Sequence, residues 1–85
     1  MESTVGENLK RARYLRGLSQ EGLAELADAN PTTIWGIETG RHAPRPSTLR
    51  KLAEALGLEV SDLLTGNLDA LIGGASGKGL APATR

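Results

Sequence analysis

The spacing of apolar side chains along the chain predicts helices and no strands. Val5, Leu9 and Ala12 recur at steps of four and three residues, which is the spacing of one face of an amphipathic helix, and Gly17 ends that helix. No alternating run of apolar and polar residues is long enough to indicate a strand. The segments predicted as helices are residues 5–16, 20–27, 31–39, 46–56 and 60–64. The fold class is therefore all-α, a compact bundle of five short helices.

The second and third predicted helices are very short and are joined by about three residues. Ser19 is a good N-cap for the second helix, and Asn30 is a good N-cap for the third, whose first position is Pro31. Proline costs nothing there, because the backbone N–H at that position is unpaired in any helix. So tight a joint forces a steep crossing and leaves one face of the third helix outside, which is the shape of a helix-turn-helix.

Leucine, isoleucine and alanine supply the predicted core of the bundle. In the second to fourth helices the residues expected to point inward are Leu23, Leu26, Ala27, Ile34, Ile37, Leu49, Leu52, Ala53 and Leu56. Gly57 ends the fourth helix. The fifth helix is expected to start near Val60 and to continue in part through Leu68 and Leu71.

The composition excludes several classes of protein. With 85 residues and no cysteine, the chain suffices for one small domain without disulfides or a thiolate metal site, and a single histidine cannot form a metal site alone. No run approaches the roughly 20 apolar residues of a membrane span, and the first residues lack the apolar segment of a signal peptide, so we expect a cytoplasmic protein. Paired carboxylates, a nucleophile with a histidine base and a phosphate-binding glycine loop are also missing, so we expect neither an enzyme nor a cofactor.

The charges balance overall but are distributed unevenly. Ten basic and ten acidic residues give a net charge of zero, which argues weakly against a nucleic-acid partner. The basic residues nevertheless gather at positions 10–16 and 41–51. Each cluster is either an ordinary solvated face or a phosphate-binding surface, depending on what lies between the two.

Between and around these clusters, the segments LSQEGLAELADANPTTIWGIETG and PRPSTLRKLAEALGLEVSDLL closely resemble the phage Cro and repressor (Xre-type) helix-turn-helix family. The resemblance covers about residues 5–64 and implies a lambda-repressor-like domain, here residues 1–66, that regulates transcription, most often as a repressor, by binding double-stranded DNA as a homodimer. It places the protein at the nucleoid. Residues 67–85 are then a C-terminal extension, partly helical at first and ending in a flexible glycine-rich tail.

The resemblance also implies that the third helix enters the major groove and that its outward residues meet base edges. The helical period points Pro31, Thr32, Trp35 and Gly36 outward, so these four are the candidates for base contact. Family members often carry a long amide or guanidinium side chain at the positions of Thr32 and Gly36. This chain lacks such side chains there, so we expect few direct hydrogen bonds to base edges. Trp35 is either a contact residue or a surface hydrophobe folded across a neighbour, and Gly36 either lets the backbone approach the duplex or merely weakens the helix.

The candidates for phosphate contact lie at the edges of the helix-turn-helix and on the first helix. They are Gln20, Thr33, Arg41, Arg45 and Arg11. For Gln20 the alternative is a plain exposed polar residue, and for Arg11 it is helix solubilisation. His42 is expected to be an exposed loop residue. The resemblance further implies that Arg13 and Glu38 form a structural ion pair between the first helix and the end of the third.

A second function from another class remains open. A helix-turn-helix domain can serve as a protein-binding adaptor of the transcription machinery, with Trp35 or the segment Leu68–Ile72 as its contact surface. Leu68, Leu71 and Ile72 either extend the last helix into a partner subunit or cover the core of their own domain. The zero net charge and the lack of long side chains at Thr32 and Gly36 favour the adaptor function. The group of candidate phosphate ligands Gln20, Arg41 and Arg45 favours DNA binding. We expect the DNA-binding function.

Overall fold

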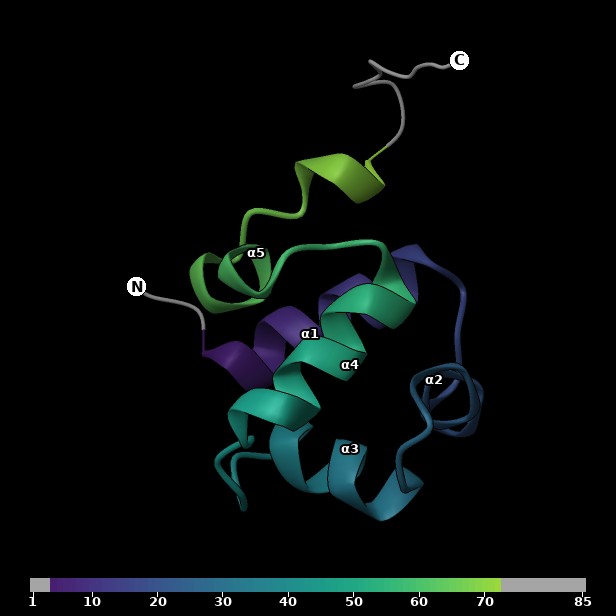
Figure 1. Cartoon of the computed structure of the whole chain (residues 1–85). Helices are drawn as coiled ribbons and strands as arrows, with labels where there is room; N and C mark the ends of the chain where they lie inside the picture. The colour runs from purple at the N-terminus through teal and green to yellow at the C-terminus, as the bar shows by residue number, and fades with distance from the viewer. Residues whose placement is uncertain (1–3, 73–85) are drawn as a thin grey trace.

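A computed structural model describes residues 4–72 of the chain, and these residues form helices and no strands (Figure 1). The helices are α1 (Val5–Leu15), α2 (Gln20–Ala27), α3 (Pro31–Glu38), α4 (Pro46–Leu56) and α5 (Val60–Thr65), followed by the short 3₁₀ turn η1 (Asp69–Leu71). The predicted all-α fold class and its five helices are therefore confirmed. The predicted glycine-rich tail lies at residues 73–85, outside the described part, and the boundary between residues 66 and 67 stays a prediction.

The helices start where short polar side chains cap them. Thr4 and Glu7 form a reciprocal capping box at α1, and the Ser19 hydroxyl accepts the Gly22 N–H at the start of α2. Asn30 caps α3 in the same way, and Pro31 is its first residue, as predicted. The ends of α1, α3 and α5 differ from the predicted ranges by one residue, which is the ordinary uncertainty of helix termini. The expected continuation of the fifth helix is wrong, because α5 ends at Thr65 with Gly66 as its C-cap, and only the separate turn η1 follows in the described part of the chain.

The core lies where α1, α2, α3, α4 and α5 meet, and its central side chains are almost fully buried. These are Leu9, Leu23, Ile34, Ile37, Leu52, Leu56 and Leu63. The prediction for Leu26 is wrong, because this side chain is 62% exposed. The buried stripe of α2 consists instead of Leu23, Ala24 and Ala27, and Leu26 lies about 110° around the helix from the middle of that stripe.

The C-terminal part of the described chain closes over α1. The side chain of Asn8 is fully buried in α1, and its Nδ2 donates to the Leu63 backbone carbonyl of α5 at 2.7 Å. Leu68, just before η1, is 2% exposed and belongs to the core. Of the two roles left open for Leu68, the structure shows the one in which it covers its own core, and an external contact through Leu68 is wrong. Ile72 is 53% exposed.

The joint between α2 and α3 is made by residues 28–30. Asp28 adopts a left-handed backbone conformation (φ 53°), which non-glycine residues seldom use and aspartate tolerates better than most. The start of α1 packs tightly on the end of α3, since a methyl group added at Gly6 would collide with the backbone carbonyl of Ile37. The turn between α2 and α3 and the end of α3 are thus both fixed in position. None of the helices within residues 4–72 has the length and apolarity to cross a membrane.

Candidate nucleic-acid interface

The C-terminal end of α3 is fixed by a buried ion pair. Arg13 of α1 donates from Nε to Glu38 Oε2 at 2.7 Å and from Nη2 to Glu38 Oε1 at 3.0 Å, a bidentate arrangement. Its Nη1 also donates to the Leu18 carbonyl at 3.0 Å. The hydrogen bonds that Arg13 donates to the Glu38 carboxylate raise the pKa of Arg13 above its ordinary value. The predicted pairing of Arg13 with Glu38 is present in the structure.

The side chain of Gln20 joins the same cluster. Its Nε2 donates to Glu38 Oε1 at 3.1 Å, and the residue is half-buried rather than a plain exposed polar side chain. An amide NH₂ carries two donors, so this bond leaves one for a phosphate oxygen. The predicted phosphate contact stays a prediction, and the structure adds that Gln20 ties the start of α2 to the end of α3.

The outward face of α3 borders a shallow groove toward α2. This groove has a volume of about 340 Å³ and is lined by Gln20, Glu21, Pro31, Thr32 and Trp35. Thr32 is exposed and Pro31 is half-buried. Three of the four residues predicted to contact bases, Pro31, Thr32 and Trp35, therefore lie together on one open surface.

Trp35 is paired with a cation. Its side chain is 42% exposed, and the Arg41 guanidinium carbon lies 5.1 Å from the centre of the indole. This distance is that of a cation–π contact. From the sequence, Trp35 is a candidate for base contact and Arg41 is a separate candidate for phosphate contact. The structure places them in one unit that presents an aromatic surface and a positive charge on the same side of α3.

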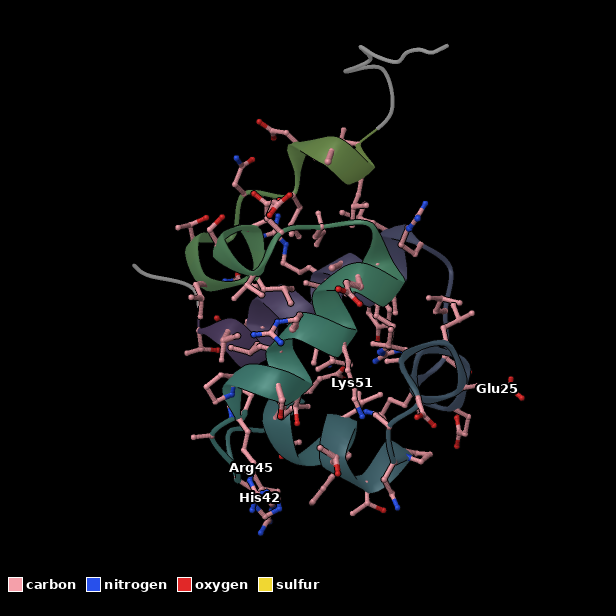
Figure 2. The ribbon with its side chains drawn as sticks, viewed as in Figure 1. Glu25, His42, Arg45 and Lys51 are labelled. Carbon is pink, nitrogen blue, oxygen red and sulfur yellow. The ribbon has the colours of Figure 1, made fainter. Side chains whose placement is uncertain are left out.

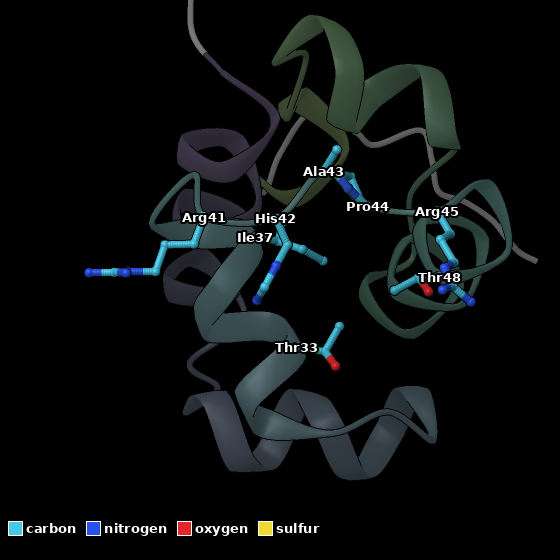
Figure 3. Close-up of a pocket in the computed structure, with 8 residues that line it drawn as sticks. All are labelled: Thr33, Ile37, Arg41, His42, Ala43, Pro44, Arg45 and Thr48. Carbon is cyan, nitrogen blue, oxygen red and sulfur yellow. The ribbon is translucent and has the colours of Figure 1, made fainter.

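Of the two interpretations of Gly36, the one in which it leaves the helix backbone open to the duplex is wrong, because Gly36 is buried. Its outward side is covered by the imidazole of His42, and a methyl group added at Gly36 would overlap that ring. The His42 backbone N–H also donates to the Gly36 carbonyl at 3.1 Å. His42 itself is exposed, as predicted, but it lies against α3 rather than standing free in the loop (Figure 3).

A second groove runs between α3 and the start of α4 (Figure 3). It has a volume of about 590 Å³ and is lined by Thr33, Ile37, Arg41, His42, Ala43, Pro44, Arg45 and Thr48. Arg45 lies across this groove from Thr33. The predicted phosphate contacts of both residues stay predictions. Arg45 and His42 project at the edge of the molecule, whereas Glu25 projects from α2 on another side (Figure 2).

The predicted phosphate ligands thus divide by position. Thr33 of α3 lines the same groove as Arg41 and Arg45, while Arg11 is an exposed residue of α1. Within residues 4–72 no three side chains of the metal-binding types gather into one group. Hydroxyl, indole, imidazole and guanidinium groups surround α3, and such groups bind base edges and phosphates.

This fold and surface match those of known proteins. The family model for a helix-turn-helix domain matches residues 4–65, most of the chain. The chain therefore belongs to the helix-turn-helix domain family, in its Cro and repressor (Xre) type, a class of DNA-binding transcription regulators.

Individual relatives agree with this membership. The chain is 41% identical to the immunity repressor of Bacillus phage phi105 over 61 residues, 72% of this chain and 42% of the repressor. It is 35% identical to the uncharacterized HTH-type transcriptional regulator y4dJ of Sinorhizobium fredii over 65 residues, 76% of this chain and 84% of y4dJ. The crystal structure of the restriction-modification controller protein C.AhdI from Aeromonas hydrophila is similar with a TM-score of 0.69 at 35% identity, covering 71% of this chain and 91% of that one.

Proposed function

We propose that the protein is a transcriptional repressor that inserts α3 into the major groove of an operator. The observation that carries this proposal is the outward surface of α3, where Thr32, Trp35 and the covering His42 are flanked by Arg41 and Arg45. Base-reading groups at the centre and cations at the rim are the arrangement that sequence-specific DNA binding requires. The similarity to a phage immunity repressor supports repression as the outcome.

The neutral total charge is compatible with this role. Glu25 projects from α2 on another side of the molecule, and Glu21 is the acidic residue in the groove beside Thr32 and Trp35. Arg41 and Arg45 supply positive charge in the loop that follows α3. Phosphate contacts depend on the local charge of the surface that meets the duplex rather than on the total charge. Two guanidinium groups per domain give few phosphate contacts, so binding by one copy is expected to be weak.

We therefore propose that two copies bind one operator. Domains of this shape bind DNA as two-fold dimers on half-sites about one helical turn apart, roughly 10 base pairs.

The role proposed is one of binding rather than catalysis, and the place of action is the cytoplasm, at the nucleoid. The protein-binding adaptor role is not favoured, because Leu68 is buried and the family match is to a DNA-binding type of regulator.

Selection of bound sequences from random duplex DNA tests the proposal. We expect the full 85-residue chain to enrich a two-fold symmetric sequence, and we expect affinity to fall as salt rises because counterions are released from the phosphates. The selected duplex should bind two chains, which sedimentation of the complex measures. Failure to enrich any sequence at low salt would overturn the proposal.

A further inference from the structure

The outward face of α3 includes a glycine, Gly36, and a side chain from the loop after α3 covers it. Thr32 and Gly36 are four residues apart and lie one above the other on the outward side of the helix. Gly36 has no side chain to present, yet it is buried, because the imidazole of His42 lies over it. His42 thus occupies the space into which a side chain at position 36 would project.

Backbone contacts hold His42 in this position. The Gly36 carbonyl accepts the N–H of Arg41 at 2.9 Å and that of His42 at 3.1 Å, so the chain turns back onto α3 directly after the helix ends. The Thr39 hydroxyl donates to the Trp35 carbonyl at 2.8 Å, which adds a bond in the same turn. The loop is therefore anchored on α3 at the residue that the imidazole covers.

The space for the ring exists only because position 36 is glycine. A Cβ built at Gly36 would overlap His42 Cδ2 and would lie 3.0 Å from its Nε2, so even alanine would displace the imidazole. The glycine is thus required by the contact between α3 and the loop, a reason that differs from both interpretations of Gly36 based on the sequence.

We propose that His42 is a specificity-determining residue: its imidazole reads a purine edge in the major groove, in place of a side chain from position 36. This inference rests on the proposed function. An imidazole ring carries an N–H that donates to an acceptor, and in the major groove the purine N7 is such an acceptor. Because the ring lies over the outward row of α3, insertion of α3 brings it to base edges, while Arg45 across the groove meets the backbone.

The test uses the operator selected by the full chain and a set of matched duplexes. In each duplex one purine is replaced by its 7-deaza analogue, which removes the N7 acceptor and leaves base pairing unchanged. Binding of the wild type, His42→Ala, Gly36→Ala and the double variant is measured for every duplex. Because His42 is exposed, His42→Ala is expected to keep the melting temperature of the wild type, which thermal denaturation checks.

For the wild type we expect one purine per half-site whose 7-deaza replacement weakens binding about threefold to tenfold, the effect of one hydrogen bond. His42→Ala should be insensitive to that replacement. Gly36→Ala should behave in the same way, since the methyl group displaces the ring, and the double variant should show no further loss.

Two results would overturn the inference while leaving the proposed function intact. One is equal sensitivity of the wild type and His42→Ala at every purine. The other is a uniform loss of affinity by His42→Ala on all duplexes with a shallower salt dependence, which would place the imidazole on a phosphate. If the wild type selects no sequence at all, the proposed function itself fails.

Discussion

The ion pair between α1 and α3 provides the most quantitative prediction of stability. In Glu38→Ala the Arg13 guanidinium loses two charge-assisted hydrogen bonds, and the amide of Gln20 loses its acceptor. The two charged side chains are only 8% and 3% exposed, so water replaces these partners poorly. Removing one member of a buried pair costs about 3–5 kcal/mol.

The lower end of that range applies here. Arg13 keeps its bond to the Leu18 carbonyl and its position 4.9 Å from the Tyr14 ring. We therefore expect Glu38→Ala to lower the free energy of unfolding by about 3 kcal/mol. In a domain of this size each kcal/mol shifts the melting temperature by about 4–8 °C, which gives a decrease of about 12–24 °C.

Chemical denaturation followed by circular dichroism measures this loss. Glu25→Ala is the matched control, because it removes an exposed carboxylate of α2 and should stay within about 0.5 kcal/mol of the wild type. Arg13→Met combined with Glu38→Met should recover much of the loss, since no buried charge is then left without a partner. A Glu38→Ala variant as stable as Glu25→Ala would refute the reasoning.

Three further predictions concern other contacts. Gly6→Ala should destabilise the fold by about 1–2 kcal/mol in thermal denaturation, because its methyl group meets a backbone carbonyl of α3, and wild-type stability would contradict this close approach. Asn8→Ala should cost about 1–2 kcal/mol in urea unfolding, since a buried carbonyl of α5 loses its donor; an unchanged midpoint would show that this bond contributes nothing. Arg41→Ala should weaken binding to all duplexes alike and reduce the salt slope by about 1, whereas a loss confined to the operator would make Arg41 a reading residue.

The elements of the fold could be predicted from the sequence because their signals are local. Ser19 and Asn30 mark helix starts through bonds to residues at most three positions away. Pro31 marks the start of α3 because proline lacks the N–H that stays unpaired at the first helical position. Leu26 is exposed although it is more apolar than the buried Ala24. In a helix of eight residues the angular position decides burial, and the small side chain of Ala24 lies on the inward side.

The contacts that shape the interface could not be predicted, because they join residues through the tertiary fold. Nothing near Gly36 in the sequence indicates that a histidine six residues later covers it. The bond from Gln20 to Glu38 joins α2 to α3 across 18 positions, and Asn8 bonds to α5 across 55. For the contact of His42 with Gly36, the only signal in the sequence is a glycine at an outward helical position, and a glycine there has several possible causes.

The central claim is that α3 and the residues covering it form the DNA-binding surface. Titration of the ¹⁵N-labelled full chain with its selected duplex, followed by nuclear magnetic resonance, tests this claim most directly. The account predicts that the largest changes occur at the backbone of Thr32, at the indole N–H of Trp35 and at His42. Changes confined to the opposite end of the chain, around Leu64 and Ile72, would contradict it.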